Sequence, residues 1–265
     1  MASPAASPPA PSVASYPVTD PLQPLVDLPG VLDAADRARD ALAAVHRHRS
    51  NRRGWQTTAA EAAVRAARSS AAIDGGGTDI PADGRVEDPI LAGSLRVGQA
   101  LDGDALRNLT ATWQRAPLQA LARLHLLAAA DLVSDELSLG RPRPEPGVAQ
   151  RLDLLVQTLH ATRAPAPVIA AVVHGELLSL RPFGSADGIV ARAASRLVTV
   201  ASGLDPHSLG VPEVFWLRRR QAYLDAAAAF GTGDPNSVGG WVILCCGALE
   251  DGAREATSIA DAAAS

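Results

Sequence analysis

Residues 180–192 read LRPFGSADGIVAR, and this stretch decides which fold the sequence predicts. Pro182 stops the apolar segment that precedes it, because proline cannot continue a helix. Phe183 supplies an apolar side chain that would anchor the turn against the core. The residues after it are small, and a new helix is expected to begin at Asp187. The stretch therefore predicts two helices joined by a tight turn.

The start of the second helix is a candidate site for an anion. Small residues that run into a helix leave its first backbone N–H groups open, and the helix dipole favours a negative charge there. Gly188 lies at this start, and Arg192 is placed to reach back toward the same space. An ordinary tight turn with Asp187 as the N-cap explains the same residues equally well.

The composition of the 265-residue chain favours closely packed helices. Hydrophobic residues make up 47% of the chain, enough for a packed core, and aromatic residues only 3%. Apolar residues recur at helical spacing in a series of segments, which are 31–48, 57–73, 104–114, 118–139, 148–161, 166–181, 187–203, 211–229 and 236–262. The segment 166–181 is apolar nearly all round and should be central. The predicted fold class is all-α, a bundle around one buried pair of helices.

Stretches rich in proline or glycine divide the chain into four parts. Residues 1–28 are rich in Pro, Ala and Ser and are interpreted as a disordered tail. Residues 29–75 are expected to form N-terminal helices that pack on the core. Residues 76–104 are interpreted as a loop connection, and residues 105–262 as the helical core.

Charge, cysteine usage and hydropathy exclude several classes of protein. The net charge of −4 argues against a general attraction to nucleic acid or anionic membranes. An arginine-rich stretch, Arg37 to Arg53, leaves a nucleic-acid-associated protein as a disfavoured hypothesis, and a solvated helix face explains it more simply. The N-terminus resembles no secretory signal, and no apolar run is long enough to span a bilayer, so we expect a cytoplasmic protein. The adjacent Cys245 and Cys246 suggest buried small hydrophobes and no metal site.

The helices around the opening stretch resemble those of the Fic (Fido) family of nucleotidyl transferases. The family signature is His-Pro-Phe-x-Asp/Glu-Gly-Asn-Gly-Arg-x-x-Arg, placed between two central helices. Upstream, APVIAAVVHGELLSLRPF is similar to the family helix that carries a histidine, here His174. The segments RAASRLVTVASGLDP, QAYLDAA and NSVGGWVILCCGAL are similar to later family helices. The resemblance covers about residues 105–250 and implies a Fic-type helical bundle.

Within the signature, the matching residues are those that shape the loop. Four positions agree with the family, namely Pro182, Phe183, Gly188 and Arg192. The others differ, because Arg181 replaces the histidine, Ser185 the acidic magnesium ligand, Ala186 the first glycine, Asp187 the asparagine and Ile189 the first arginine.

The resemblance implies a chemistry that these replacements oppose. In the family, the histidine takes a proton from a target hydroxyl, which then attacks the α-phosphate of ATP. Arg181 stays protonated and cannot act as a base. Loss of the acid at Ser185 weakens any binding of ATP with magnesium. We therefore predict a regulatory or nucleotide-binding protein that is inactive as a standard AMP transferase and acts on an unknown protein partner. A divergent transferase that uses Asp187 is the alternative.

Two further segments resemble family elements. The run RSSAAIDGGG places Ser70 and Asp74 where the family has an inhibitory helix motif whose acid pairs with the last signature arginine. The matching pair here is Asp74 and Arg192, although a solvated Asp74 at a helix end is an equal alternative. The segment LGRPRPEPG stands at the family's target-binding flap, and its prolines make strand addition poor.

Overall fold

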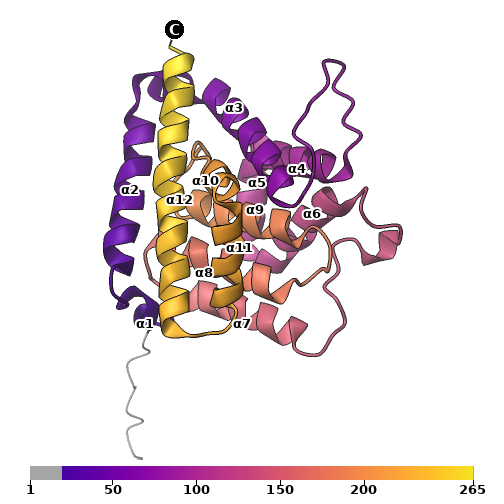
Figure 1. The fold of residues 1–265 in the computed structure, drawn as a ribbon, viewed down its shortest axis with the longest axis vertical. Helices are drawn as coiled ribbons and strands as arrows, with labels where there is room; N and C mark the ends of the chain where they lie inside the picture. Colours follow the sequence, from indigo (N-terminus) through magenta and orange to yellow (C-terminus); the bar gives the residue numbers. More distant parts are fainter. Residues whose placement is uncertain (1–19, 265) are drawn as a thin grey trace, which may run out of the picture.

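The computed structural model describes residues 20–264, and every regular element within this range is a helix (Figure 1). The α-helices are α1 (Gln23–Val26), α2 (Val31–Arg47), α3 (Arg49–Ile73), α4 (Pro89–Ala100), α5 (Gly103–Arg115), α6 (Pro117–Ala129), α7 (Val148–Ala161), α8 (Ala166–Leu180), α9 (Asp187–Ala201), α10 (Pro212–Arg218), α11 (Arg220–Phe230) and α12 (Pro235–Ala262). One 3₁₀ turn covers Glu136–Ser138. The all-α prediction is therefore confirmed.

Helix α8 is the centre of the fold. It packs antiparallel to α9, and its buried residues contribute to both of the large hydrophobic clusters. One cluster joins α8 to α2, α11 and α12, and the other joins α8 to α5, α6, α7 and α9. Because an apolar surface all round needs cover on every side, this position agrees with the sequence of the helix. Helix α2 lies along the long α12, as Figure 1 shows.

Helix α4 was not predicted, because glycines and prolines recur along the segment that we interpreted as a loop, and two of the glycines lie within the helix. Asp88 caps the helix by accepting a hydrogen bond from the Leu91 N–H group at 2.7 Å, and Pro89 takes the first position. Gly93 is needed where α4 crosses α6, since a Cβ atom there would lie 2.1 Å from the Ala128 carbonyl oxygen. The glycine thus serves close packing and does not break the helix.

Other boundaries also differ from the sequence predictions, and α3 begins at Arg49 and not at 57. Residues 23–26 of the expected tail form the short α1, while residues 1–19 lie outside the described range. Helix α6 ends at Ala129 and not at 139, and Asp135 caps a separate 3₁₀ turn. The expected helix 211–229 is divided at Arg219, whose backbone leaves helical geometry while its guanidinium lies over the Phe215 ring.

Candidate functional site

The loop between α8 and α9 has the tight turn that its sequence predicts. Arg181 ends α8 in the left-handed conformation at φ 47°, and Ala186 adopts φ 51° before α9 begins. Side chains other than glycine rarely adopt this conformation without support from their surroundings. Pro182 is buried, and Phe183 stacks on the ring of His125 with centroids 4.2 Å apart. The neighbouring elements therefore hold the loop in shape.

His125 on α6 is one of these supports. It is 1% exposed, its Nδ1 accepts a hydrogen bond from the Gly140 N–H group at 2.9 Å, and its Nε2 lies 3.1 Å from Ser185 Oγ. Burial lowers the pKa of His125 to about 4, so the ring is neutral at pH 7. Since Nδ1 accepts a hydrogen bond, Nε2 carries the ring hydrogen, and this N–H group donates a hydrogen bond to Ser185 Oγ. His125 consequently positions Ser185 and does not activate it as a nucleophile.

Arg143 is the second support, and it comes from residues 139–147, the segment whose sequence resembles the family's flap. Its backbone N–H group donates to the Pro182 carbonyl at 2.7 Å. Its side chain donates to the carbonyls of Arg181 at 2.8 Å and Leu180 at 3.2 Å. A cation that caps these carbonyls also complements the negative end of α8. The flap-like segment is thus fastened across the loop.

Asp187 faces the loop interior and not Arg181. Its Oδ1 accepts from the Phe183 N–H group at 2.9 Å, and its Oδ2 is buried with no hydrogen-bond partner. Burial raises the pKa of this carboxyl, which is 7% exposed, while backbone N–H groups partly offset the effect. The ion pair with Arg181 that would close the pocket is not formed, although both residues are described. Asp187 therefore stabilises the turn.

Arg192 and Asp74 form an ion pair, which is one of the two alternatives that the sequence left open. Arg192 is 1% exposed, and its Nη2 lies 2.8 Å from Asp74 Oδ2. It also donates to Ser70, at 2.8 Å to Oγ and 3.1 Å to the carbonyl oxygen, and to the Tyr223 hydroxyl at 3.4 Å. Burial alone would lower the pKa of Arg192, but the Asp74 carboxylate and the Tyr223 oxygen together outweigh burial and raise the pKa. The arginine joins α9 to the C-terminal end of α3.

The Asp74 carboxylate lies against Gly188, at the candidate anion site. A Cβ atom on Gly188 would be 2.6 Å from Asp74 Oδ2 and 2.7 Å from Oδ1. The carboxylate therefore rests directly against the first turn of α9. Because this is the position that favours an anion, a side chain of the protein itself fills it.

Gly188→Ala should lower the free energy of unfolding by about 1–3 kcal/mol, the usual cost of overpacking. Alanine is normally the better helix former by about 1 kcal/mol, so a loss of stability would show that the methyl group displaces Asp74. Chemical denaturation measures the effect. Stability equal to or above that of the wild type would contradict the close approach of the carboxylate.

His174 lies behind this pair as a buried core residue. Its Nε2 is 2.9 Å from the Tyr223 hydroxyl, and its ring contacts Trp216 and Trp241 edge-on. Burial lowers the pKa of His174 well below its usual value and raises that of Tyr223. The interpretation of His174 as a hydrogen-bonded core histidine agrees with these contacts.

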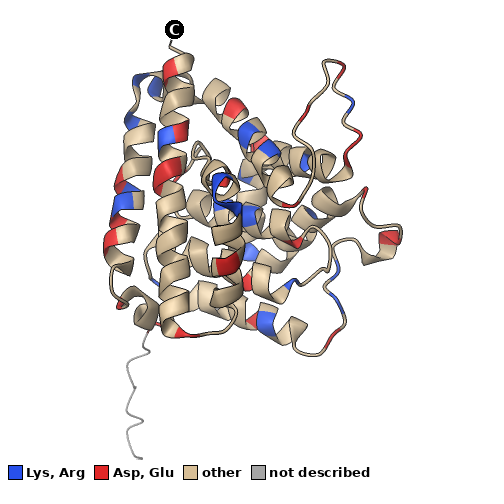
Figure 2. Cartoon of the chain, viewed as in Figure 1, with Lys and Arg blue, Asp and Glu red and all other residues tan. Residues whose placement is uncertain are grey.

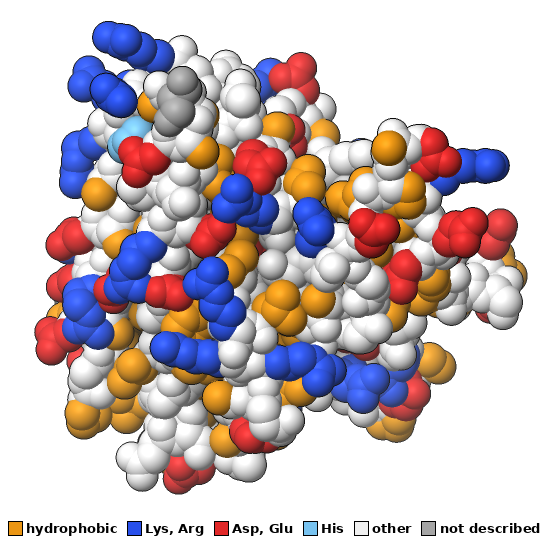
Figure 3. All heavy atoms as spheres, turned by 45° about the horizontal axis from the view of Figure 1, so that its top comes forward, with side chains coloured by type: hydrophobic (Ala, Val, Ile, Leu, Met, Phe, Trp, Pro, Cys, Tyr) orange, Lys and Arg blue, Asp and Glu red, His pale blue; other side chains and the backbone are white. Residues whose placement is uncertain are grey.

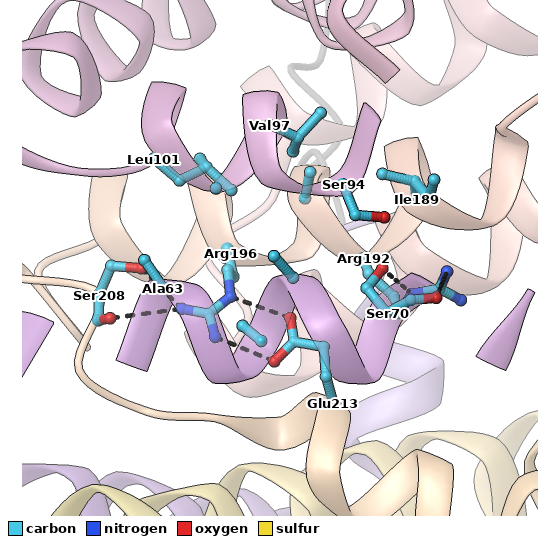
Figure 4. A pocket seen from close by; sticks show the side chains of 14 residues that line it. Ala63, Ser70, Ser94, Val97, Leu101, Ile189, Arg192, Arg196, Ser208 and Glu213 are labelled. Atoms are coloured by element: carbon cyan, nitrogen blue, oxygen red, sulfur yellow. Dashed lines mark hydrogen bonds and ion pairs between the residues drawn. The ribbon is translucent and has the colours of Figure 1, made fainter. Parts of the chain in front are cut away.

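Arg196, one turn after Arg192, forms a second buried ion pair that the sequence analysis did not identify. It contacts Glu213 through two nitrogens at 2.9 Å each, and it donates to the Ser208 hydroxyl at 2.7 Å (Figure 4). The cavity beside it measures about 30 Å³, room for about one water molecule. This network joins α9 to α10 and is structural.

An open pocket borders Gly188 at the start of α9. It measures about 420 Å³ and is bordered by the ends of α3 and α8, by the start of α9 and by α11. Among the predicted site residues, Asp74, Arg181, Ser185, Asp187 and Gly188 line it. Arg192 is sealed behind Asp74.

The residues of this pocket do not fit magnesium. Hard cations need several free oxygen ligands, preferably carboxylates. Here Ser185 accepts from His125, Asp74 is bound to Arg192, and Asp187 has one oxygen engaged and the other buried. Within residues 20–264, we find no group of three or more His, Cys, Asp or Glu side chains arranged to hold a metal ion.

The arginine-rich stretch forms an exposed corner far from the pocket. Figure 2 shows basic residues where α2 meets α3, near the C-terminus, and Figure 3 shows their side chains gathered on this part of the surface. Arg37 and Arg39 pair with carboxylates, whereas in the described part of the chain Arg47, Arg49, Arg52 and Arg53 form no ion pairs. Nucleic-acid binding at this corner stays a disfavoured hypothesis. No helix between residues 20 and 264 has the length and hydropathy to cross a bilayer.

Comparison with solved structures places this helical arrangement in a known fold class. The structure of a Fic family protein from Desulfovibrio desulfuricans G20 matches with a TM-score of 0.61, covering 87% of this chain and 74% of that protein. The two sequences are 18% identical, so the likeness is one of fold. No family model and no curated protein matches the sequence. The chain has the Fic-type fold, as predicted.

Proposed function

We propose that this chain is a Fic-fold protein that no longer transfers AMP and acts as a regulatory, ligand-binding protein. The observation that carries the proposal is the Asp74 carboxylate, which lies against Gly188 and pairs with the buried Arg192. A phosphate would need this same position. Nucleotide binding at Gly188 and Arg192 therefore requires that Asp74 first be displaced.

The groups nearest the loop also lack the means for base catalysis. Arg181 is a permanent cation, and the only ring N–H group of His125 donates a hydrogen bond to the Ser185 hydroxyl. A positioned general base contributes about 10²–10⁴-fold to the rate, so its loss alone would make AMP transfer slow. The alternative, a divergent transferase with Asp187 as base, requires this carboxyl to leave the Phe183 N–H group.

Incubation with labelled ATP, other nucleoside triphosphates and cell lysate tests the loss of transfer. We expect no label on any protein, with the wild type or with Asp74→Gly. Asp83→Gly, which changes an exposed carboxylate outside the pocket, is the matched control. Robust label transfer that disappears in Asp187→Asn would establish the divergent transferase instead.

Calorimetric titration with ATP, with and without magnesium, tests binding separately. Removal of the Asp74 carboxylate frees Arg192 and the first N–H groups of α9, and hydrogen bonds to charged groups contribute about 1.5–3 kcal/mol. Asp74→Gly should therefore bind ATP at least about tenfold more tightly than the wild type. Equal affinity in both would show that Asp74 does not occupy the phosphate position.

A further inference from the structure

The pocket beside the loop adjoins a groove between α8 and α11. The pocket measures about 420 Å³, within the usual range for small-molecule sites. The groove, of about 510 Å³, shares Leu178 and Leu224 with it and extends to Gly231. The two hollows therefore adjoin at these leucines.

The wall of the pocket is aliphatic over most of its area. Its larger apolar side chains come from five helices and from the segment after α6, and they are Ile73, Ile90, Leu132, Leu178, Ile189 and Leu224. Leu224 is 37% exposed, so part of this surface is open to water. No aromatic ring lines the pocket within the described residues, and a nucleobase would find no stacking partner there.

The free charges of the pocket are positive. Arg181 and Arg220 are both exposed, and across residues 20–264 neither forms an ion pair. Arg220 is held by a 2.7 Å hydrogen bond from its Nε to the Ile73 carbonyl, which leaves its terminal nitrogens free. The two carboxylates that line the pocket are less available, because Asp74 is bound to Arg192 and Asp187 is 7% exposed.

We infer that this site binds an amphipathic anion, with a carboxylate or phosphate head group at Arg181 and Arg220 and an unbranched aliphatic chain along the α8–α11 groove. The guanidinium groups supply the charge-assisted hydrogen bonds that an anionic head requires. Leu178 and Leu224 lead the chain from the head group into the groove. A triphosphate fits less well, since Asp74 fills the start of α9. The inference rests on the proposed binding function and names its ligand class.

Isothermal titration calorimetry with a chain-length series of carboxylates tests the ligand class, using butanoate, hexanoate, octanoate and decanoate below their micellar concentrations. Full burial of a methylene contributes about 0.8 kcal/mol, so the affinity should rise up to about fourfold per added methylene. Octyl phosphate tests the other head group. Acetate, inorganic phosphate and octan-1-ol, which each lack one half of the ligand, should bind at least about tenfold more weakly than octanoate.

Variants of the two arginines test the head-group site. Loss of a charged hydrogen bond costs about 1.5–3 kcal/mol, so Arg181→Gln and Arg220→Gln should each weaken octanoate binding by about 10–100-fold. Arg219→Gln is the matched control, because this exposed arginine adjoins Arg220 in sequence but lies over the Phe215 ring outside the pocket. Leu224→Asn should weaken decanoate more than butanoate, whereas Leu154→Asn on the exposed face of α7 should change neither.

Three results would overturn the inference. They are an affinity independent of chain length, octanoate binding that survives in both arginine variants, and tighter binding of magnesium ATP than of decanoate by the wild type. None of them involves label transfer. Transfer of AMP would reject the proposed function, while loss of the calorimetric signal alone would reject only the ligand class.

Discussion

Arg192→Leu should lower the free energy of unfolding by about 3–5 kcal/mol, the cost of breaking a buried ion pair. Arg192 is 1% exposed. Its guanidinium donates hydrogen bonds to the hydroxyl and carbonyl oxygens of Ser70, to the Asp74 carboxylate and to the Tyr223 hydroxyl. A leucine would leave these groups without their partner and α3 without its main polar link to α9. Urea denaturation followed by circular dichroism measures the change.

A double-mutant cycle with Asp74→Asn separates the ion pair from the loss of packing. We expect a coupling energy between Arg192 and Asp74 of about 1–3 kcal/mol, because the residues are in direct contact. Arg107→Leu, which removes an exposed arginine paired with Asp104, should change stability by less than about 0.5 kcal/mol. A loss below about 1 kcal/mol in Arg192→Leu would contradict the role of this residue as a buried clamp.

The local parts of the site could be predicted from the sequence. Pro182, the small residues after it and the apolar helix before it fix a tight turn through short-range geometry alone. Ser70 and Asp74 contact Arg192 across a long stretch of sequence, since Asp74 and Arg192 are 118 residues apart. Only the resemblance to a known motif suggested this contact. Without that resemblance, a solvated Asp74 at a helix end explained the same sequence equally well.

The parts that were missed depend on contacts between distant segments. His125 and Arg143 hold the loop from 60 and 38 residues away, and no local pattern indicates which distant segment either residue contacts. A polar residue on an otherwise apolar helix face, as at His125 and Arg196, was the available signal, since a buried polar group needs a partner. Helix α4 was missed because Gly93 looks like a helix breaker until its approach to Ala128 is known.

Acidification from pH 7 to pH 4 should destabilise the protein by about 2–3 kcal/mol through His125 alone. The unfolded imidazole takes up a proton near pH 6.5, whereas burial keeps the folded pKa at about 4. The unfolded state therefore binds more protons between these values, so the stability is complete above pH 6.5 and falls as the pH drops toward 4. His174, whose pKa burial also lowers, adds to the same trend.

His125→Asn tests this prediction, because the asparagine oxygen can still accept from the Gly140 N–H group but does not titrate. The variant should be less stable at pH 7, since it loses the stacking on Phe183, yet its free energy of unfolding should fall less steeply between pH 6.5 and 4. His160→Asn, at an exposed position on α7, should keep the wild-type slope. Equal slopes in wild type and His125→Asn would contradict a neutral, buried His125, and with it the assignment of Nε2 as the donor that holds Ser185 in the loop.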